Sequence, residues 1–385
     1  MIFANDCNTV VYVSKKFLHF ICFYNNSLQN VENLCAQYPD NRTLRLSLFA
    51  HADPLSGRYF GESAGICYLC RERTGGGAAP TAQSENAMAN NSLKAWIVAT
   101  RPWSFTASAL TVIVVLAYLQ WLLGSIDWAR GGWAVGAIIL FHAAGNTWSD
   151  WHDFRRGVDA PDTYGVKTLT GGSFTPRAIR NLSLGLFAAA LAAGIALMCC
   201  TGWPLLGIGL GGLLCALCYP PLKYRALGDV VILLAYGLLP ALGTSYVATG
   251  AIHWEVLWVA APVGLLVDAI LHANNTRDMR TDRRASIRTL AHRLGVRGSV
   301  TLYTLELVVP FLWIALLAPL GHFPVWSLAV ALLAPLAWGN IRSMRNYRSE
   351  GDAAAIAAHD QRSAQLQLLY CVLLTGSFLL DGWLR

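Results

Sequence analysis

The chain has 385 residues, of which 55% are hydrophobic and only 13% are charged, and its mean hydropathy is +0.43. Because a soluble domain carries about 25% charged residues, this composition excludes an ordinary soluble domain and indicates a helical protein that crosses a membrane several times. The formal net charge of +7 is interpreted as basic loops on the cytoplasmic side of a membrane rather than as a nucleic-acid-binding surface.

Residues 1–87 differ in composition from the rest of the chain. They contain no tryptophan, although the chain has 14, and they end in a run rich in glycine, alanine and proline. Cys67 and Cys70 have the spacing of zinc ligands but lack a second ligand pair, so no zinc site is expected. We predict a poorly ordered N-terminal extension over 1–87, which would lie outside the native product if translation began at Met88, and a transmembrane domain over 88–385.

From Trp96 onward the apolar pattern becomes regular. Each apolar run has about the ~20 residues that a helix needs to cross the hydrocarbon core, and tryptophans gather near the ends of the runs, as in an aromatic belt. We predict about nine spanning helices, at 103–123, 132–152, 178–200, 203–219, 229–249, 255–276, 299–318, 324–341 and 364–383.

The loops between these predicted helices differ strongly in charge. The loops after the second, fourth, sixth and eighth helices are rich in arginine and lysine, whereas Arg130 is the one clear cation of the opposite loops. The positive-inside rule therefore predicts that the basic loops are cytoplasmic. On this assignment the N-terminus is cytoplasmic and the C-terminus lies on the other side of the membrane.

Two acidic clusters end the second and the sixth predicted helix, on this same side of the membrane. The first cluster contains Asn146, Asp150 and Asp153, and the second contains Asn274, Asn275, Asp278 and Asp282. Within each cluster the spacing places the asparagine and the aspartates on one helix face. The two clusters are therefore expected to face one another across a shared cavity, and ionisable residues in such a position are candidates for function.

Oxygen ligands suit hard cations, and Mg²⁺ usually takes one or two carboxylates together with substrate phosphates. We therefore expect two Mg²⁺ ions that bridge one diphosphate. The expected metal ligands are Asn146, Asp150, Asp153, Asp278 and Asp282. The interleaved Arg277 and Arg288 are expected to contact phosphate oxygens. Two alternatives remain open: the acids cap helix ends and pair with neighbouring arginines, or they line a proton or ion pathway.

At these residues the chain resembles the UbiA superfamily of intramembrane prenyltransferases, over roughly residues 94–384. Within it the chain is similar to the 1,4-dihydroxy-2-naphthoate polyprenyltransferases of menaquinone synthesis. The stretches that carry the resemblance are Arg101–Ser104, Asn146–Asp159, Tyr219–Gly228, Asn274–Arg283, Arg288–Leu290 and Arg293–Gly295. The second motif is also similar to that of the vertebrate menaquinone-4 prenyltransferase. One departure is Ser286-Ile287-Arg288, where the branch often has Gly-Lys, so Arg288 is the candidate replacement for that lysine.

The resemblance implies an all-α, UbiA-type bundle of nine helices with a central cavity open to the cytoplasm, in a bacterial cytoplasmic (inner) membrane. It implies transfer of a polyprenyl group from polyprenyl diphosphate to 1,4-dihydroxy-2-naphthoate, with loss of the carboxylate, giving demethylmenaquinone. The residues assigned to catalysis are Asp150, Asp153, Asp278 and Asp282. The residues assigned to substrate binding are Asn146, Asn274, Asn275, Arg277, Lys167, Arg101, Lys223, Tyr224 and Arg288.

Three rival functions are kept beside this one. The first is the same reaction with another acceptor, namely 4-hydroxybenzoate, homogentisate or haem. The second is a membrane transporter or channel that uses the same acids to bind ions. The third is an inactive scaffold in a quinone-synthesis complex. Magnesium-dependent release of pyrophosphate from a prenyl diphosphate separates the enzymes from the other two.

Overall fold

The computed structural model describes residues 10–14, 43–47, 92–159, 163–165 and 167–385. The chain divides into two units, Met1–Thr81 and Ala82–Arg385. In the first unit, β1 (Val10–Ser14) and β2 (Thr43–Ser47) form an antiparallel pair in which Val10 lies opposite Ser47. The predicted extension over 1–87 otherwise falls outside the described residues, and so does the Cys67–Cys70 pair.

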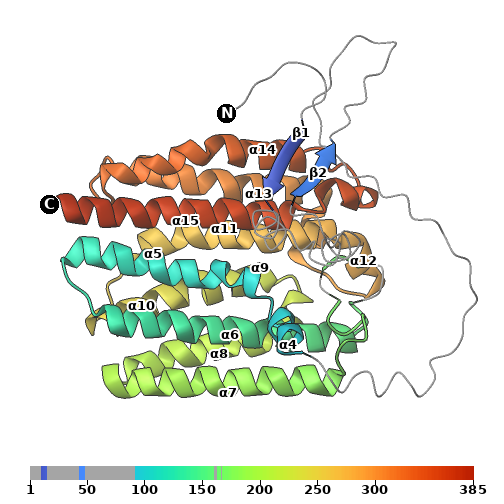
Figure 1. Cartoon of the computed structure of the whole chain (residues 1–385), viewed down its shortest axis with the longest axis horizontal. Coiled ribbons are helices and arrows are strands. Elements are labelled where there is room, and N and C mark those ends of the chain that lie inside the picture. Colours follow the sequence, from blue (N-terminus) through green and yellow to red (C-terminus); the bar gives the residue numbers. More distant parts are fainter. Residues whose placement is uncertain (1–9, 15–42, 48–91, 160–162, 166) are drawn as a thin grey trace, which may run out of the picture. The chain divides into compact units, whose positions relative to one another are not determined.

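The second unit is built of helices (Figure 1). Its elements are α4 (Leu93–Ala99), η1 (Pro102–Ser104), α5 (Thr106–Leu123), α6 (Trp128–Arg155), α7 (Pro176–Thr201), α8 (Pro204–Lys223), α9 (Gly228–Ile232), η2 (Leu233–Leu238), α10 (Leu239–Thr249), α11 (Val256–Arg277), α12 (Met279–Arg284), α13 (Leu290–Leu317), η3 (Val325–Leu333), α14 (Ala334–Met344), η4 (Glu350–Ile356) and α15 (His359–Leu384). Within the described residues, eight helical segments are long and apolar enough to cross a membrane. The prediction of an all-α, multi-pass membrane protein is therefore confirmed.

The helix α6 is a further long helix beyond these eight segments, and it packs against α5, α7 and α8. It has 28 residues and carries the first acidic cluster near its end. With α6 included, the helices correspond to the nine predicted from the apolar runs. Their bounds agree to within a few residues in most cases, because the length of a spanning helix is fixed by the apolar thickness that it crosses.

Two predicted helices differ in detail from the observed ones. The seventh begins at Leu290 rather than at residue 299, because the chain turns at Gly295, with φ 65° and ψ 178°, and a short helical stretch precedes this kink. The fifth predicted helix is made of three consecutive segments, namely the α-helix α9, the π-helical segment η2 and the α-helix α10. Thr111 in α5 donates a hydrogen bond of 2.8 Å to the carbonyl of Tyr236 in this segment.

The interior of the helical unit lies along α5, α11 and α15, which pack against one another. Tyr118, Phe323 and Phe378 form a buried aromatic contact there, with ring centroids 5.3–6.0 Å apart. Elsewhere small residues allow close approach: a Cβ added at Gly237 would lie 3.4 Å from the Cα of Gly264. Packing of this kind is the main force between helices in a membrane, where burial of apolar surface from water contributes little.

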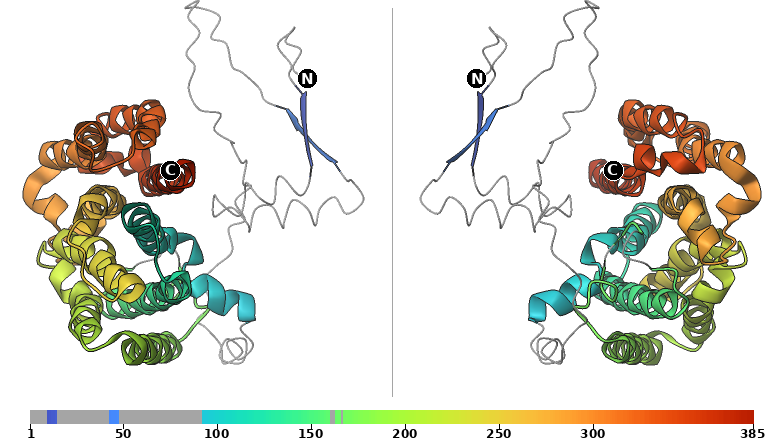
Figure 2. Two further views of the ribbon diagram at one scale, coloured as in Figure 1. Left: turned by 90° about the vertical axis from the view of Figure 1, so that its left-hand side faces the viewer. Right: turned by 90° about the vertical axis from the view of Figure 1, so that its right-hand side faces the viewer.

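The long helices run side by side, and their end-on arrangement is visible in Figure 2. The C-terminal end of α6, the short helix α12 and the start of α15 gather at the right-hand end of the helical unit in Figure 1. This end contains both acidic clusters, which the sequence also placed at equivalent helix ends. We refer to it below as the polar end.

Candidate diphosphate–metal site

Asp150 and Asp153 lie on one face of α6 and are both buried. Arg101 forms an ion pair with Oδ1 of Asp150 through Nη2. Arg101 has a left-handed backbone, with φ 58° and ψ 58°, at the bend between α4 and η1. The second carboxylate oxygen of Asp150, Oδ2, is buried and has no hydrogen-bond partner among the described residues. Asp150 therefore keeps one oxygen that is free to accept a ligand.

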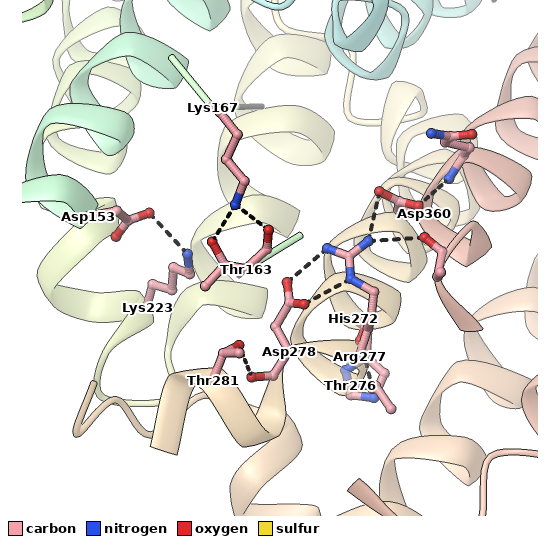
Figure 3. A network of polar contacts seen from close by, with 12 residues as sticks. Asp153, Thr163, Lys167, Lys223, His272, Thr276, Arg277, Asp278, Thr281 and Asp360 are labelled. Atoms are coloured by element: carbon pink, nitrogen blue, oxygen red, sulfur yellow. Dashed lines mark hydrogen bonds and ion pairs between the residues drawn. The ribbon is translucent and has the colours of Figure 1, made fainter. Parts of the chain in front are cut away.

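Asp153 is held by two residues from the end of α8. The Tyr224 hydroxyl donates to Oδ1 of Asp153 over 2.5 Å. Nζ of Lys223 lies 3.4 Å from Oδ2 of Asp153, a contact that Figure 3 shows. Burial first, and then the charge of Asp153, raises the pKa of the Tyr224 hydroxyl, so Tyr224 stays protonated and acts as a donor. This arrangement joins the first acidic cluster to the segment between α8 and α9.

The second cluster lies at a break between two helices. α11 ends at Arg277 and α12 begins at Met279, so Asp278 stands between them, with φ −91° and ψ 5°. Helical hydrogen bonds of 2.9 Å still join Asp278 N to Asn274 O, and Asp282 N to Asp278 O. The predicted common face of these residues is therefore largely preserved, although the helix is not continuous.

Arg277 is buried and its guanidinium is occupied by protein groups. It donates through Nε and Nη2 to the two oxygens of Asp278, each over 2.8 Å, and through Nη1 to Asp360 and to the carbonyl of Ala357 over 3.3 Å (Figure 3). The Tyr164 ring lies 4.9 Å from the guanidinium carbon. Arg277 thus fixes the position of the Asp278 carboxylate and ties it to the start of α15.

The charges of both clusters act on Asp282. Burial raises the pKa of Asp282, Lys223 and Arg277 lower it, and Asp278 and Asp153 add to the rise, so that the pKa is about 7. Asp282 lies on α12 and Asp153 on α6, and both side chains are buried. Figure 3 shows the side chains of Asp153, Lys223 and Asp278 on facing sides of one region at the polar end. Asp153 from the first cluster and Asp278 from the second therefore lie in one region, and their common role stays a prediction.

The three predicted asparagines differ in their hydrogen bonds and in their burial. Asn146 donates through Nδ2 to the Thr100 carbonyl and to the Ser104 hydroxyl, each over 3.0 Å, which fixes the amide beneath Asp150. Nδ2 of Asn275 is buried without a hydrogen-bond partner among the described residues. Asn274 is half-buried at the end of α11.

Two of the predicted phosphate contacts lie in loops. Lys167 donates to the carbonyl and to the hydroxyl of Thr163, the latter over 2.9 Å (Figure 3). Arg288 has an exposed side chain, and its backbone N–H donates to the carbonyl of Tyr224 over 3.3 Å. Arg288 is therefore attached to the segment that holds Asp153, and its predicted contact with phosphate stays a prediction.

The donor set suits Mg²⁺ completed by a phosphate ligand. Among the described residues, no group of three or more His, Cys, Asp or Glu side chains is arranged to enclose a metal ion. Asp150 instead offers a single buried oxygen, Oδ2, that has no hydrogen-bond partner among the described residues. Mg²⁺ commonly takes one or two carboxylates and receives its other ligands from substrate phosphates and water. Asp150, Asp153 and Asp282 therefore fit a metal–diphosphate unit better than a site made of protein ligands alone.

Several residues at this end were not predicted as site residues. Asp159 follows α6, and burial and the charge of Asp153 raise its pKa. Asp360 anchors Arg277 from a distance of 83 residues along the chain, which no local spacing could reveal. Tyr219 precedes Lys223 by one helical turn. Its i, i+4 spacing to Lys223 could have indicated that Tyr219 lies on the same helix face as this predicted site residue.

Backbone strain also marks this end. Three non-glycine residues have positive φ in the described part of the chain: Arg101, Ala226 and Ser286. Arg101 bears the ion pair to Asp150, Ala226 follows the Lys223–Tyr224 segment, and Ser286 follows α12. Such conformations cost about 1–3 kcal/mol each and gather at functional sites. Their positions beside the acids agree with a site whose geometry is imposed by the fold.

Comparison with known proteins identifies the family. The model of the UbiA prenyltransferase family matches residues 97–369. The chain belongs to the UbiA prenyltransferase family. This confirms the family predicted from the two motifs, and family membership supports prenyltransferase activity. The predicted 1,4-dihydroxy-2-naphthoate branch is a finer assignment than the family match provides.

A relative agrees with this assignment, and two solved structures have a similar fold. The chain is 34% identical over 282 residues to the UbiA prenyltransferase domain-containing protein 1 of Danio rerio, which covers 71% of this chain and 81% of that protein. The fold is similar to the apo structure of a UbiA homolog from Aeropyrum pernix K1, with a TM-score of 0.54, 18% identity, and coverage of 71% of this chain and 97% of that one. It is also similar to a digeranylgeranylglyceryl phosphate synthase, with a TM-score of 0.52, 16% identity, and coverage of 74% and 98%.

Proposed function

We propose that this UbiA-family protein transfers a polyprenyl group from a polyprenyl diphosphate to 1,4-dihydroxy-2-naphthoate in a Mg²⁺-dependent reaction, with loss of the ring carboxylate. The observation that carries the proposal is that Asp153 on α6, with Lys223 3.4 Å from its carboxylate, lies in the same region of the polar end as Asp278 at the end of α11 (Figure 3). Acids from two distant segments, with a cation beside them, form the arrangement that a metal-bound diphosphate needs, since acids alone would repel it.

Each acid is assigned a role from its contacts. Asp150 and Asp153, with Asn146, would hold one Mg²⁺–diphosphate centre, and Asp278 and Asp282, with Asn274 or Asn275, would hold the other. When bound, Mg²⁺ supplies positive charge that stabilises the departing diphosphate. The expected number of ions is two, because the acids come in two sets on opposite sides of the same region.

The cations act on the diphosphate or on the acids. Lys223 lies beside Asp153 and is assigned to the phosphate oxygens, together with Lys167, Arg101 and Arg288. Arg277 was predicted to contact phosphate, but its donors are occupied by Asp278, Asp360 and Ala357. We assign Arg277 to holding the Asp278 carboxylate in position. Tyr224 does the same for Asp153 through its hydroxyl.

Charge separation explains why this site favours prenyl transfer. Breaking the allylic C–O bond leaves negative charge on the diphosphate and positive charge on the prenyl group. Preorganised cations at the polar end stabilise the first charge, and they cost no reorganisation during the reaction. The electron-rich acceptor ring then attacks the prenyl carbon, and apolar helices accommodate the tail.

The acceptor is assigned from the sequence motifs. The stretch Asn274–Arg283 and the segment Arg101–Ser104 resemble the naphthoate branch. 4-Hydroxybenzoate and homogentisate are the alternative acceptors. The basic loops at the same end of the helical unit support a site that faces the cytoplasm. A bacterial inner membrane is the location implied by the naphthoate branch, whereas the relative named above comes from an animal.

The test is a prenyl-transfer assay on the purified protein in lipid. The protein is incubated with geranylgeranyl or longer diphosphates and with dihydroxynaphthoate, 4-hydroxybenzoate and homogentisate in parallel. We expect Mg²⁺-dependent release of pyrophosphate and a prenylated, decarboxylated naphthoate product. Asp150→Ala and Asp278→Ala should each lower the rate by about 10²-fold or more, because each removes charge stabilisation of the leaving group.

Asp381→Asn is the matched control. Asp381 is also an aspartate in a long helix, but it accepts a hydrogen bond from Trp121 near the opposite end of α5. Its substitution should leave the rate unchanged. Absence of pyrophosphate release in the unaltered protein would contradict the proposal and would favour a transporter or a scaffold. Prenylation of another acceptor alone would contradict the naphthoate assignment.

A further inference from the structure

A chain of hydrogen bonds beside the proposed site joins α6 to the turn that carries Arg101. It runs from Ser108 on α5 through His142 on α6 to Ser104 in η1, and it ends at Asn146, one helical turn after His142. Ser108 and His142 are buried. Polar groups inside a spanning bundle are costly unless they are hydrogen-bonded to one another. The proposed site uses Arg101 and Asn146, but it gives no role to the other three residues.

The contacts of Ser104 fix the direction of these hydrogen bonds. Its hydroxyl has a single hydrogen, which goes to the shortest contact, of 2.8 Å to the carbonyl oxygen of Arg101. The hydroxyl oxygen then accepts from Nδ2 of Asn146 over 3.0 Å and from Nε2 of His142 over 3.3 Å. Nε2 of His142 is therefore the nitrogen that carries a hydrogen toward Ser104.

The rest of the His142 ring is held as well. Nδ1 lies 2.9 Å from the Ser108 hydroxyl. The ring centroid of His142 lies 5.6 Å from that of Phe105 and 4.7 Å from that of Tyr236. Tyr236 belongs to η2, and π-helical segments of this kind are frequent at functional sites. Hydrogen bonds at both nitrogens and two neighbouring rings thus leave the imidazole little freedom to turn.

The amide of Asn146 is oriented by the same Ser104 hydroxyl. Nδ2 uses both of its hydrogens, one for the Thr100 carbonyl and one for Ser104, each over 3.0 Å. The carbonyl only accepts, so the nitrogen and not the oxygen of the amide must lie beside it. Oδ1 of Asn146 accepts no hydrogen bond from the described residues. This oxygen is the atom of the amide that Mg²⁺ can use, since Mg²⁺ takes oxygen ligands.

The turn itself is fixed to α6 on both sides of Arg101. Asn146 holds the carbonyl that precedes Arg101, and Ser104 holds the carbonyl of Arg101. The left-handed backbone of Arg101 persists only where its surroundings impose it. From this turn the guanidinium reaches Asp150. His142, Asn146 and Asp150 follow one another at intervals of four residues, so one face of α6 binds the whole turn.

We propose that His142 is a positioning residue of the prenyl-transfer site. Through Ser104 it keeps Oδ1 of Asn146 available to Mg²⁺ and keeps the Arg101 guanidinium on Asp150. This inference rests on the proposed function, in which Asn146 binds the metal and Arg101 contacts the diphosphate. Without the hydrogen bond from His142, Ser104 is free to turn, and the amide can present its nitrogen, which a cation rejects. Groups that orient a metal ligand typically change metal affinity by about 10–100-fold.

Mg²⁺ titration of the full chain in lipid nanodiscs, with an unreactive prenyl thiodiphosphate present, tests this role without relying on activity. His142→Leu removes both ring nitrogens and should weaken Mg²⁺ binding by about 10–100-fold. His142→Gln should restore most of the affinity, because its amide nitrogen can donate to Ser104. A merely structural role predicts a lower melting temperature with unchanged Mg²⁺ affinity of the folded protein, and this result would overturn the proposal.

Ser104→Ala interrupts the chain at its next member. It should weaken Mg²⁺ binding by a similar factor. In the Ser104→Ala background, His142→Leu should add less than about twofold, because residues of one network do not contribute additively. Additive losses in the double variant would mean that His142 does not act through Ser104, and they would overturn the proposal.

Ser183→Ala is the matched control. The Ser183 hydroxyl is also buried and also binds α6, at the carbonyl of Ala144 over 3.0 Å, but it lies outside this chain of hydrogen bonds. Its substitution should leave Mg²⁺ affinity unchanged. Equal affinities of Ser104→Ala and the unaltered protein would overturn the inference alone, even if His142→Leu failed to fold. Absence of Mg²⁺-dependent binding in the unaltered protein would refute the proposed function, and the inference with it.

Discussion

At the scale of single residues, the site depends on how each acid is held. Asp153 receives a hydrogen bond from Tyr224 and lies beside Lys223, whereas Asp278 is clamped by Arg277. In contrast, Asp150 retains a buried oxygen without a partner among the described residues. The carboxylates are therefore fixed before substrate arrives, which lowers the cost of ordering them when metal and diphosphate bind.

Asp282 provides a prediction about pH. Burial, aided by Asp278 and Asp153, raises its pKa from 3.8 to about 7. Between these values the folded, metal-free protein binds more protons than the unfolded chain, so its stability falls as pH rises from about 4 to about 7. Binding of Mg²⁺ should show the opposite dependence and strengthen as pH rises through about 7, because the proton competes with the ion.

Thermal unfolding of the metal-free protein and Mg²⁺ titration, each at several pH values, check this prediction. Asp282→Asn should flatten both dependences, because the amide does not titrate. If the variant and the unaltered protein followed the same two curves, Asp282 would not be the group responsible.

The acids themselves were predictable from local spacing, but their partners were not. Asn146, Asp150 and Asp153 follow a helical repeat that is visible in the sequence. The contact of Arg277 with Asp360 joins residues 83 positions apart, and that of Tyr224 with Asp153 joins residues 71 positions apart. Such pairs arise from the packing of helices, which the spacing of residues within one helix does not encode.

At the scale of elements, breaks in the helices shape the polar end. α11 gives way to α12 at Asp278, and α13 contains the kink at Gly295. The apolar runs predicted the spanning parts of these helices, since period and length are local properties. They did not predict the helical stretch before Gly295, because its sequence is polar and basic and does not resemble a membrane span.

Gly295 provides a prediction at this scale. With φ 65° and ψ 178° it occupies a region of backbone space that is essentially restricted to glycine. A Cβ there would meet no atom within 4 Å, so the cost of a substitution would come from the backbone alone. We expect Gly295→Ala to lower the free energy of unfolding by about 1–3 kcal/mol.

Gly136→Ala is the matched control for this substitution. Gly136 lies within α6, and an added Cβ would also meet nothing within 4 Å, but its backbone is helical. Alanine there should be neutral or should stabilise the helix by up to about 1 kcal/mol. Thermal unfolding of both variants in the same detergent measures the difference. Equal changes in the free energy of unfolding for the two variants would show that an alanine side chain does not strain the backbone at position 295.

At the scale of the whole molecule, the helical unit places both acid clusters at one end. This end also carries the basic loops after α6, α8, α11 and α14. The sequence alone predicted this sidedness from the charge of the loops and the number of helices. Beyond the expected facing of the second and sixth helix ends, it did not predict which helices pack together, because apolar runs of similar composition fit many packing arrangements.

Sidedness can be measured by thiol labelling. In a cysteine-free background, Ser286→Cys adds a thiol to the exposed loop after α12, and Ser125→Cys adds one to the exposed loop between α5 and α6. A membrane-impermeant reagent should label position 125 in right-side-out vesicles and position 286 in inside-out vesicles. The reverse pattern would place the acids on the outer side of the membrane and contradict the assignment from loop charge.

The central claim is that acids from α6 and from α12 act together on one metal-bound diphosphate. A double-mutant cycle tests it most directly, using Mg²⁺-dependent binding of an unreactive prenyl thiodiphosphate to the unaltered protein, Asp153→Asn, Asp282→Asn and the double variant. We predict that the second substitution costs much less once the first is present, with a coupling energy of about 0.5–3 kcal/mol. Strictly additive losses would mean that the two carboxylates act on separate ligands, which would contradict the account.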